Sequence, residues 1–135
     1  MKRYSKSQSL VEFAITIPIL LLLLFGIFDL GRAFYIKVVM TNAAREGAKH
    51  LAFHPDDKGN GYADTKLAAQ NEAVSSGVAI TVDDVIAFCT DSDTSGECDE
   101  DTPAQVTVEL EMNLGIFGLF ASTNTISSTA NMVVP

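Results

Sequence analysis

The chain has 135 residues, a net charge of -8 and a mean hydropathy of +0.23, so it fits one domain with a modest core and is unusually apolar for a soluble one. Lys66 is the last basic residue, and the acidic remainder of the chain would repel phosphate, which excludes nucleic acid as a partner. The sequence offers two cysteines, two histidines and no nucleophile–base pattern, phosphate loop or dinucleotide fingerprint, so we expect no catalytic site and no enzymatic function.

A basic N-terminus precedes a strongly apolar segment. Residues 1–7 contain basic side chains and no acid, and residues 10–28 contain a single charge, that of Glu12. As an α-helix this segment would be about 28 Å long, close to the thickness of the hydrocarbon core of a bilayer. Because positive flanks stay in the cytoplasm, we expect a single-pass anchor with its N-terminus inside and the rest of the chain outside.

Glu12 is unusual because a carboxylate in an apolar helix is costly unless it is paired, protonated or hydrated at the membrane surface. Two interpretations remain open. The residue lies at the level of the lipid headgroups, or it meets a cationic partner that another chain supplies.

We expect the helix to continue beyond the apolar segment and to end near Phe53, because Pro55 disfavours a helical conformation at the residue before it. Pro18 and Gly26 are the positions where we expect a kink or local melting. Apolar side chains recur with a roughly helical period after the apolar segment: Leu30, Phe34, Val38, Ala44 and Leu51.

The block KSQSLVEFAITIPILLLLLFGIFDLGRAFY at residues 6–35, followed by TNAAREGAKHLA at 41–52, resembles the TadE-like family. Proteins of this family are pilin-like minor subunits of tight-adherence (Tad) pili, a branch of the type IV filament systems. The resemblance implies an α+β, pilin-like fold in which a long N-terminal helix packs on a small antiparallel sheet. We therefore expect a leader over residues 1–7, a long helix over 8–54 and an extracytoplasmic globular domain over 55–135.

The resemblance also implies processing and assembly. A prepilin-type peptidase of the inner membrane removes such leaders and leaves a glutamate at the fifth mature position, which here places the cut between Ser7 and Gln8. Ser7 departs from the usual glycine. In filaments of this kind the glutamate pairs with the amino group of a neighbouring subunit, so Glu12 and the adjacent Phe13 are the expected assembly residues.

The expected function is that of a structural subunit, pilin or minor pilin, of a Tad or type IV-like surface filament that supports adhesion. The subunit would start as an inner-membrane precursor and join copies of itself or other pilins in an extracellular filament. Two alternatives stay open. One is a permanently anchored accessory protein or adhesin of the pilus system, and the other is a calcium-regulated binding module.

The globular domain is predicted to contain one further helix over Ala63–Ser75, closed by Gly77, with Leu67, Ala68 and Val74 facing inward. Residues 78–82, 85–88, 104–112 and 125–134 are predicted strands. Alternation within the third strand predicts one buried face: Val106, Val108, Leu110 and Met112. The segment 116–120 is either a connection folded on the core or an apolar patch that docks on a neighbour.

Cys89 and Cys98 lie close together in sequence, in a domain that we expect outside the cytoplasm. An oxidising compartment and a glycine-bearing loop between them favour a disulfide over a catalytic thiol.

The acidic loop around Cys98 resembles the start of a calcium loop. Its candidate ligands are Asp91, Asp93, Ser95 and Asp99. Thr102 stands where such a loop needs a bidentate glutamate, so we favour a solvated acidic loop and expect no cofactor. His50 and His54 have a spacing that fits a zinc pair with Asp56 or Asp57, but solvent-facing histidines are the favoured interpretation.

Overall fold

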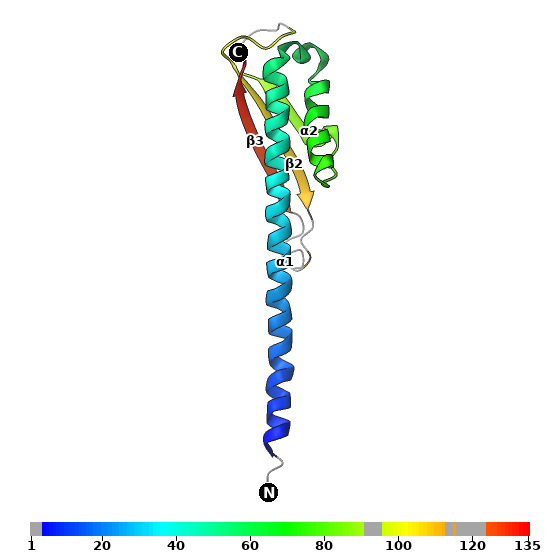
Figure 1. Cartoon of the computed structure of the whole chain (residues 1–135), viewed down its shortest axis with the longest axis vertical. Helices are drawn as coiled ribbons and strands as arrows, with labels where there is room; N and C mark the ends of the chain where they lie inside the picture. The colour runs from blue at the N-terminus through cyan, green and yellow to red at the C-terminus, as the bar shows by residue number, and fades with distance from the viewer. Residues whose placement is uncertain (1–3, 91–95, 113–114, 116–123) are drawn as a thin grey trace.

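The computed structural model describes residues 4–90, 96–112, 115 and 124–135 (Figure 1). Its helices and strands are α1 (Tyr4–Phe53), α2 (Ala63–Ser75), β1 (Val85–Cys89), β2 (Pro103–Met112) and β3 (Asn124–Val133), with short 3₁₀ helices η1 (Pro55–Asn60) and η2 (Val82–Asp84) between them. We call α1 up to residue 35 the stalk, and the rest of the molecule the head. The expected α+β arrangement, a long helix packed on a small antiparallel sheet, is confirmed.

Helix α1 is unbroken over 50 residues, which corresponds to roughly 75 Å. It passes through Pro18 and Gly26 without a sharp bend, so the expected kink or melting is wrong (Figure 1). A proline removes one N–H donor from the ladder, and the hydrogen bonds on either side of it keep the helix continuous here. The helix ends at Phe53, as Pro55 predicted, and it begins at Tyr4, inside the expected leader.

The buried face of α1 starts at Ile36. Leu30 and Phe34 are 69% and 71% exposed, and Val38 is also exposed, so these three residues do not face the core. A strict spacing of four residues drifts around the helix by about 40° at each step, so residues that recur at this spacing do not all lie on one face. The residues that do face the core are Ile36, Val39, Met40, Ala43, Ala44, Ala48, Leu51 and Ala52.

Helix α2 has the predicted bounds but packs on α1 through its small residues. Thr65, Ala69 and Ala73 are buried, whereas Leu67 and Val74 are 45% and 51% exposed and Ala68 is half-buried, so the predicted inward face is wrong. The two helices approach too closely for larger side chains. A Cβ atom added to Gly47 of α1 would lie 3.2 Å from the Cβ atom of Ala69.

The end of α2 is closed by Gly77, as predicted. Gly77 has a φ of +79°, and its N–H donates to the Val74 carbonyl at 2.9 Å. The next N–H, that of Val78, donates to the Ala73 carbonyl at 3.0 Å. This pair of bonds is the Schellman motif, which needs a residue that tolerates the left-handed conformation.

The described strands form an antiparallel sheet in the order β1-β2-β3, with Val85 opposite Val108 and Val106 opposite Ala130. The predicted strands at 85–88, 104–112 and 125–134 are confirmed within a residue or two at their ends. The buried residues of β2 are Ala104, Val106, Val108 and Met112, and Leu110 is partly buried, so its predicted face is confirmed apart from that one position.

Residues 78–82 do not form the predicted strand. Val78 and Ile80 are buried, so the alternation in the sequence correctly indicates an inward face. The segment instead runs as a connection, and the side-chain amide of Gln70 donates to the Ile80 carbonyl at 2.9 Å. Alternation reports burial on one face and carries no information about whether a neighbouring strand is available for pairing.

Candidate membrane and assembly surfaces

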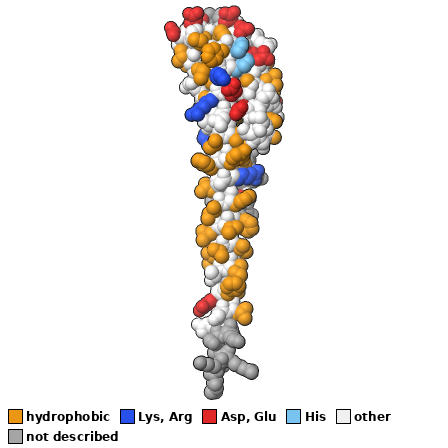
Figure 2. All heavy atoms as spheres, viewed as in Figure 1, with side chains coloured by type: hydrophobic (Ala, Val, Ile, Leu, Met, Phe, Trp, Pro, Cys, Tyr) orange, Lys and Arg blue, Asp and Glu red, His pale blue; other side chains and the backbone are white. Residues whose placement is uncertain are grey.

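The apolar stalk is the most distinctive surface of the molecule. The large apolar side chains from Leu10 to Phe28 are exposed, and Figure 2 shows a band of hydrophobic side chains along the stalk. In the described part of the chain, α1 is the one helix long and apolar enough to cross a membrane. No residue in its most apolar stretch is buried against the head. So large an exposed apolar surface is stable only against lipid or against other apolar helices.

Glu12 and Phe13 lie near the base of the stalk, and both side chains are exposed. The Glu12 carbonyl accepts a hydrogen bond from the Thr16 hydroxyl at 2.8 Å, whereas its carboxylate forms no ion pair with any residue that the structure describes. A cationic partner within the described chain is therefore absent. Any such partner has to come from beyond these residues.

Ser7 and Gln8 lie within the first turns of α1. Peptidases bind their substrates in an extended conformation, so cleavage between these residues requires the start of α1 to unwind. Helix ends fray readily, because their first backbone N–H groups have no partner within the helix.

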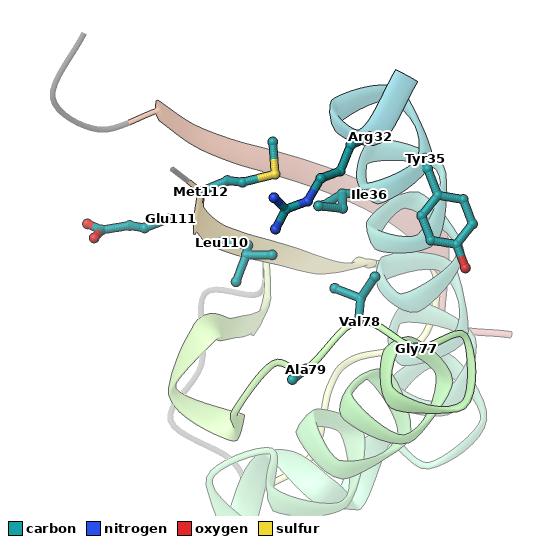
Figure 3. Close-up of a pocket in the computed structure, with 9 residues that line it drawn as sticks. All are labelled: Arg32, Tyr35, Ile36, Gly77, Val78, Ala79, Leu110, Glu111 and Met112. Carbon is teal, nitrogen blue, oxygen red and sulfur yellow. The ribbon is translucent and has the colours of Figure 1, made fainter. Parts of the chain in front are cut away.

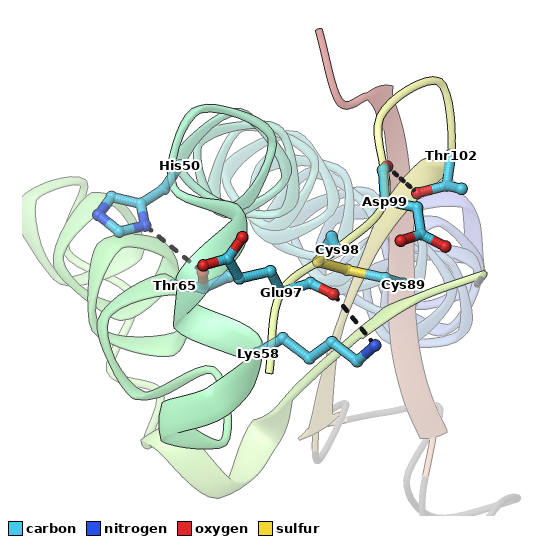
Figure 4. Close-up of a disulfide and its surroundings, with 8 residues drawn as sticks. All are labelled: His50, Lys58, Thr65, Cys89, Glu97, Cys98, Asp99 and Thr102. Atoms are coloured by element: carbon cyan, nitrogen blue, oxygen red, sulfur yellow. Dashed lines mark hydrogen bonds between the residues drawn. A yellow bond between two sulfur atoms is a disulfide. The ribbon is translucent and has the colours of Figure 1, made fainter. Parts of the chain in front are cut away.

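Cys89 and Cys98 form the predicted disulfide (Figure 4), which lies beside the turn that follows the C-terminal end of α1. Their Cα atoms are 5.8 Å apart, and both residues are buried. Further contacts tie this loop to the turn after α1. The N–H of Cys98 donates to the Pro55 carbonyl at 2.9 Å, and the Lys58 ammonium donates to the Glu97 carbonyl at 3.2 Å.

Asp57 is a structural residue that the sequence did not reveal. It is buried, and its carboxylate accepts hydrogen bonds from the N–H groups of Asp64 at 3.2 Å and Thr65 at 2.8 Å. These are orphan donors of the first turn of α2. The one sequence signal was indirect, because Tyr62 at the N-cap has no side chain suited to capping, so an acceptor had to come from elsewhere.

The two histidines stack, with ring centroids 4.4 Å apart. Nδ1 of His50 lies 3.4 Å from the Thr65 hydroxyl, and Nδ1 of His54 lies 3.1 Å from the His50 carbonyl. Asp57 borders the same cavity, but its carboxylate oxygens already cap α2. Within the residues that the structure describes, no group of three ligands is placed to hold a metal ion.

The calcium hypothesis falls mostly outside the described residues, as Asp91, Asp93 and Ser95 do. Asp99 is described, and its backbone carbonyl accepts the hydroxyl of Thr102 at 2.5 Å in a turn (Figure 4). The apolar segment 116–120 also lies outside the described residues.

In a comparison with protein families, the model of the TadE-like protein family matches residues 8–49. This segment covers most of α1 and none of α2 or the strands. The resemblance expected from the sequence is thus confirmed over the stalk and the part of α1 that packs in the head. Comparison with curated proteins and comparison with solved structures each found no match.

Proposed function

Starting from the TadE-like match of residues 8–49, which links the chain to the Tad pilus, we propose that the protein is a structural subunit of a Tad or type IV-like surface filament, as a pilin or a minor pilin. The observation that carries the proposal is the division of α1 into a bare apolar half and a half packed on the head. The filament itself would serve adhesion or surface attachment.

The division of α1 suits both states of such a subunit. In the precursor, the stalk crosses the inner membrane as a single-pass anchor. In the filament, the same side chains pack against the stalks of copies of this chain or of other pilins. Moving from lipid into a bundle of helices keeps the apolar surface away from water, so one segment serves as anchor and as assembly interface.

Two features support the proposed orientation of the precursor. The basic N-terminus is expected to stay in the cytoplasm, which places the head outside. The Cys89–Cys98 disulfide supports the same orientation, because disulfides persist in oxidising compartments outside the cytoplasm.

Processing by a prepilin-type peptidase would expose the amino group of Gln8. We propose that this group pairs with the Glu12 carboxylate of a neighbouring subunit, next to Phe13. The absence of an ion-pair partner for Glu12 within the described chain supports this role. A buried, unpaired carboxylate is strongly destabilising, so the pairing would also select the correct register between stalks.

A permanently anchored accessory protein or adhesin of the pilus system is the second candidate. Two observations favour it: Ser7 stands where a glycine is usual, and α1 begins at Tyr4, so that the bond to be cut lies within a helix. In this case the leader stays on the chain and the stalk never leaves the membrane.

The two candidates are separated by the mass and the N-terminal sequence of the protein in sheared surface filaments and in membranes. A chain that begins at Gln8 and is abundant in the sheared fraction supports the filament subunit. A chain that begins at Met1 and occurs only in membranes overturns it in favour of the anchored accessory protein.

A further inference from the structure

A cavity of about 560 Å³ lies where the head meets the top of the stalk (Figure 3). It is bordered by α1, by the segment 77–79 after α2, and by the end of β2. Most of its lining is apolar: Ile36, Val78, Ala79, Leu110 and Met112.

Arg32 supplies the positive charge of this cavity. Its guanidinium lies between Ile36 and Met112, against the head (Figure 3). Arg32 is exposed, and no ion pair or hydrogen bond joins it to another described residue, so its guanidinium is open to a ligand. A planar guanidinium with several N–H donors is well suited to bind a phosphate group in a bidentate manner.

The other two polar side chains that line the cavity, Tyr35 and Glu111, form no hydrogen bond or ion pair with Arg32 in the described structure. The carboxylate of Glu111 points away from the guanidinium (Figure 3). The hydroxyl of Tyr35 points to the opposite side and donates to the Ser76 carbonyl at 2.6 Å.

The depth of the cavity relative to a membrane follows from the length of the stalk. Arg32 lies about one helical turn beyond Phe28, which is roughly 6 Å along the axis of α1. With residues 10–28 in the hydrocarbon core, this is the level of the lipid headgroups, since the polar layer adds about 5 to 7 Å on each side of the core.

From these observations we infer that the cavity binds the phosphodiester group of a membrane phospholipid, with Arg32 as its anion ligand. The apolar lining then contacts the glycerol and the first acyl carbons of the same lipid. A free phosphate ion would leave this lining without a partner, which is why we assign a lipid. The inference rests on the membrane-spanning precursor of the proposed function and does not depend on filament assembly.

The test uses the full chain in phospholipid nanodiscs, extracted into a mild detergent and weighed intact by native mass spectrometry. Arg32→Gln removes the proposed ligand. Arg45→Gln is the matched control. It removes the same charge from another exposed position of the same helix, and Arg45 lies outside the cavity, in a groove with Asn42 and Glu72. We expect wild type and Arg45→Gln to retain one phospholipid, and Arg32→Gln to bind it about tenfold more weakly, as the loss of a charge-assisted hydrogen bond predicts.

A second variant, Ala79→Leu, fills the cavity and keeps Arg32. It is expected to lose the lipid as well, with a thermal unfolding midpoint close to that of the wild type. Equal lipid retention in all variants overturns the inference. Displacement of the lipid by millimolar inorganic phosphate, with phosphate bound in its place, overturns the assignment to a lipid.

Flotation of the same variants with vesicles separates this inference from the proposed function. A wild-type chain that floats but retains no lipid contradicts the cavity site alone. A wild-type chain that does not float contradicts the membrane-spanning precursor itself.

Discussion

The buried carboxylate of Asp57 accepts the backbone N–H of Thr65 at 2.8 Å, so α2 is capped by a residue of the preceding turn. This contact fixes η1 against α2 and thereby the path of the chain after α1. It replaces the local cap that Tyr62 cannot provide.

Replacing this cap should destabilise the head. Asp57→Ala is expected to lower the free energy of unfolding by about 1 to 2 kcal/mol, as the loss of a helix cap does. Asp56→Ala, at an exposed neighbouring position, is the control and should change it by less than about 0.5 kcal/mol. Urea unfolding of the full chain in detergent measures both. Equal effects of the two variants would show that the cap is unimportant.

The close approach of α1 and α2 at Gly47 gives a second prediction. A larger side chain there meets Ala69 and also Val106, whose Cγ1 atom would lie 3.0 Å from an added Cβ. Gly47→Leu is therefore expected to lower the free energy of unfolding by about 1 to 3 kcal/mol through overpacking. Gly31→Ala is the matched control, because nothing lies within 4 Å of a Cβ at that position of the same helix. It should be neutral or slightly stabilising, and a loss of stability equal to that of Gly47→Leu would contradict this account.

The disulfide should contribute measurably to the stability of the head. Replacing both Cys89 and Cys98 by alanine is expected to lower the free energy of unfolding by about 2 to 3 kcal/mol, since the bridge closes a short loop and restricts the unfolded chain. Unfolding of the wild type with and without reductant checks the result independently. A wild type that is unaffected by complete reduction would contradict the prediction.

The role of Glu12 is tested by assembly in cells. Glu12→Gln keeps the size of the side chain and removes its charge, so we expect normal amounts of protein in the membrane and at least a tenfold loss from sheared filaments. Glu109→Gln, on the exposed face of β2, is the control and should assemble normally. If Glu12→Gln gives the same filament yield as the wild type, the proposed pairing of Glu12 is wrong.

Calcium is expected to have no effect on the head, because Thr102 replaces the bidentate glutamate of a calcium loop. The thermal unfolding midpoint of the full chain should be the same with millimolar calcium and with a chelator. A rise in that midpoint that Asp93→Asn abolishes would instead identify the loop of Asp91, Asp93, Ser95 and Asp99 as a binding site.

The sequence predicted the bounds of the helices and strands better than it predicted which of their faces are buried. The bounds of α2 were readable because Gly77 stops the helix and a turn-rich loop precedes it. The inward face of α2 could not be predicted, because burial of Ala69 and Ala73 in preference to Leu67 depends on how closely α1 approaches α2. That distance is set by Gly47, which lies in another helix.

The candidate sites likewise divide into those that the sequence predicted and those that it did not. The Cys89–Cys98 bridge could be predicted because the two cysteines lie close together in sequence, in a part of the chain that was expected outside the cytoplasm. The cavity at Arg32 could not be predicted, because segments distant in sequence form its walls. The Asp57 cap was missed for a different reason: Asp57 lies seven and eight residues before its two donors, outside the N-cap position where a capping side chain is expected.

The continuity of α1 has a mechanical consequence. A helix without a hinge transmits axial displacement from one end to the other, so raising its base by one turn raises the head by the same distance, about 5.4 Å. Work done on the base of the stalk is therefore delivered to the disulfide-closed far end of the molecule without a flexible joint to absorb it.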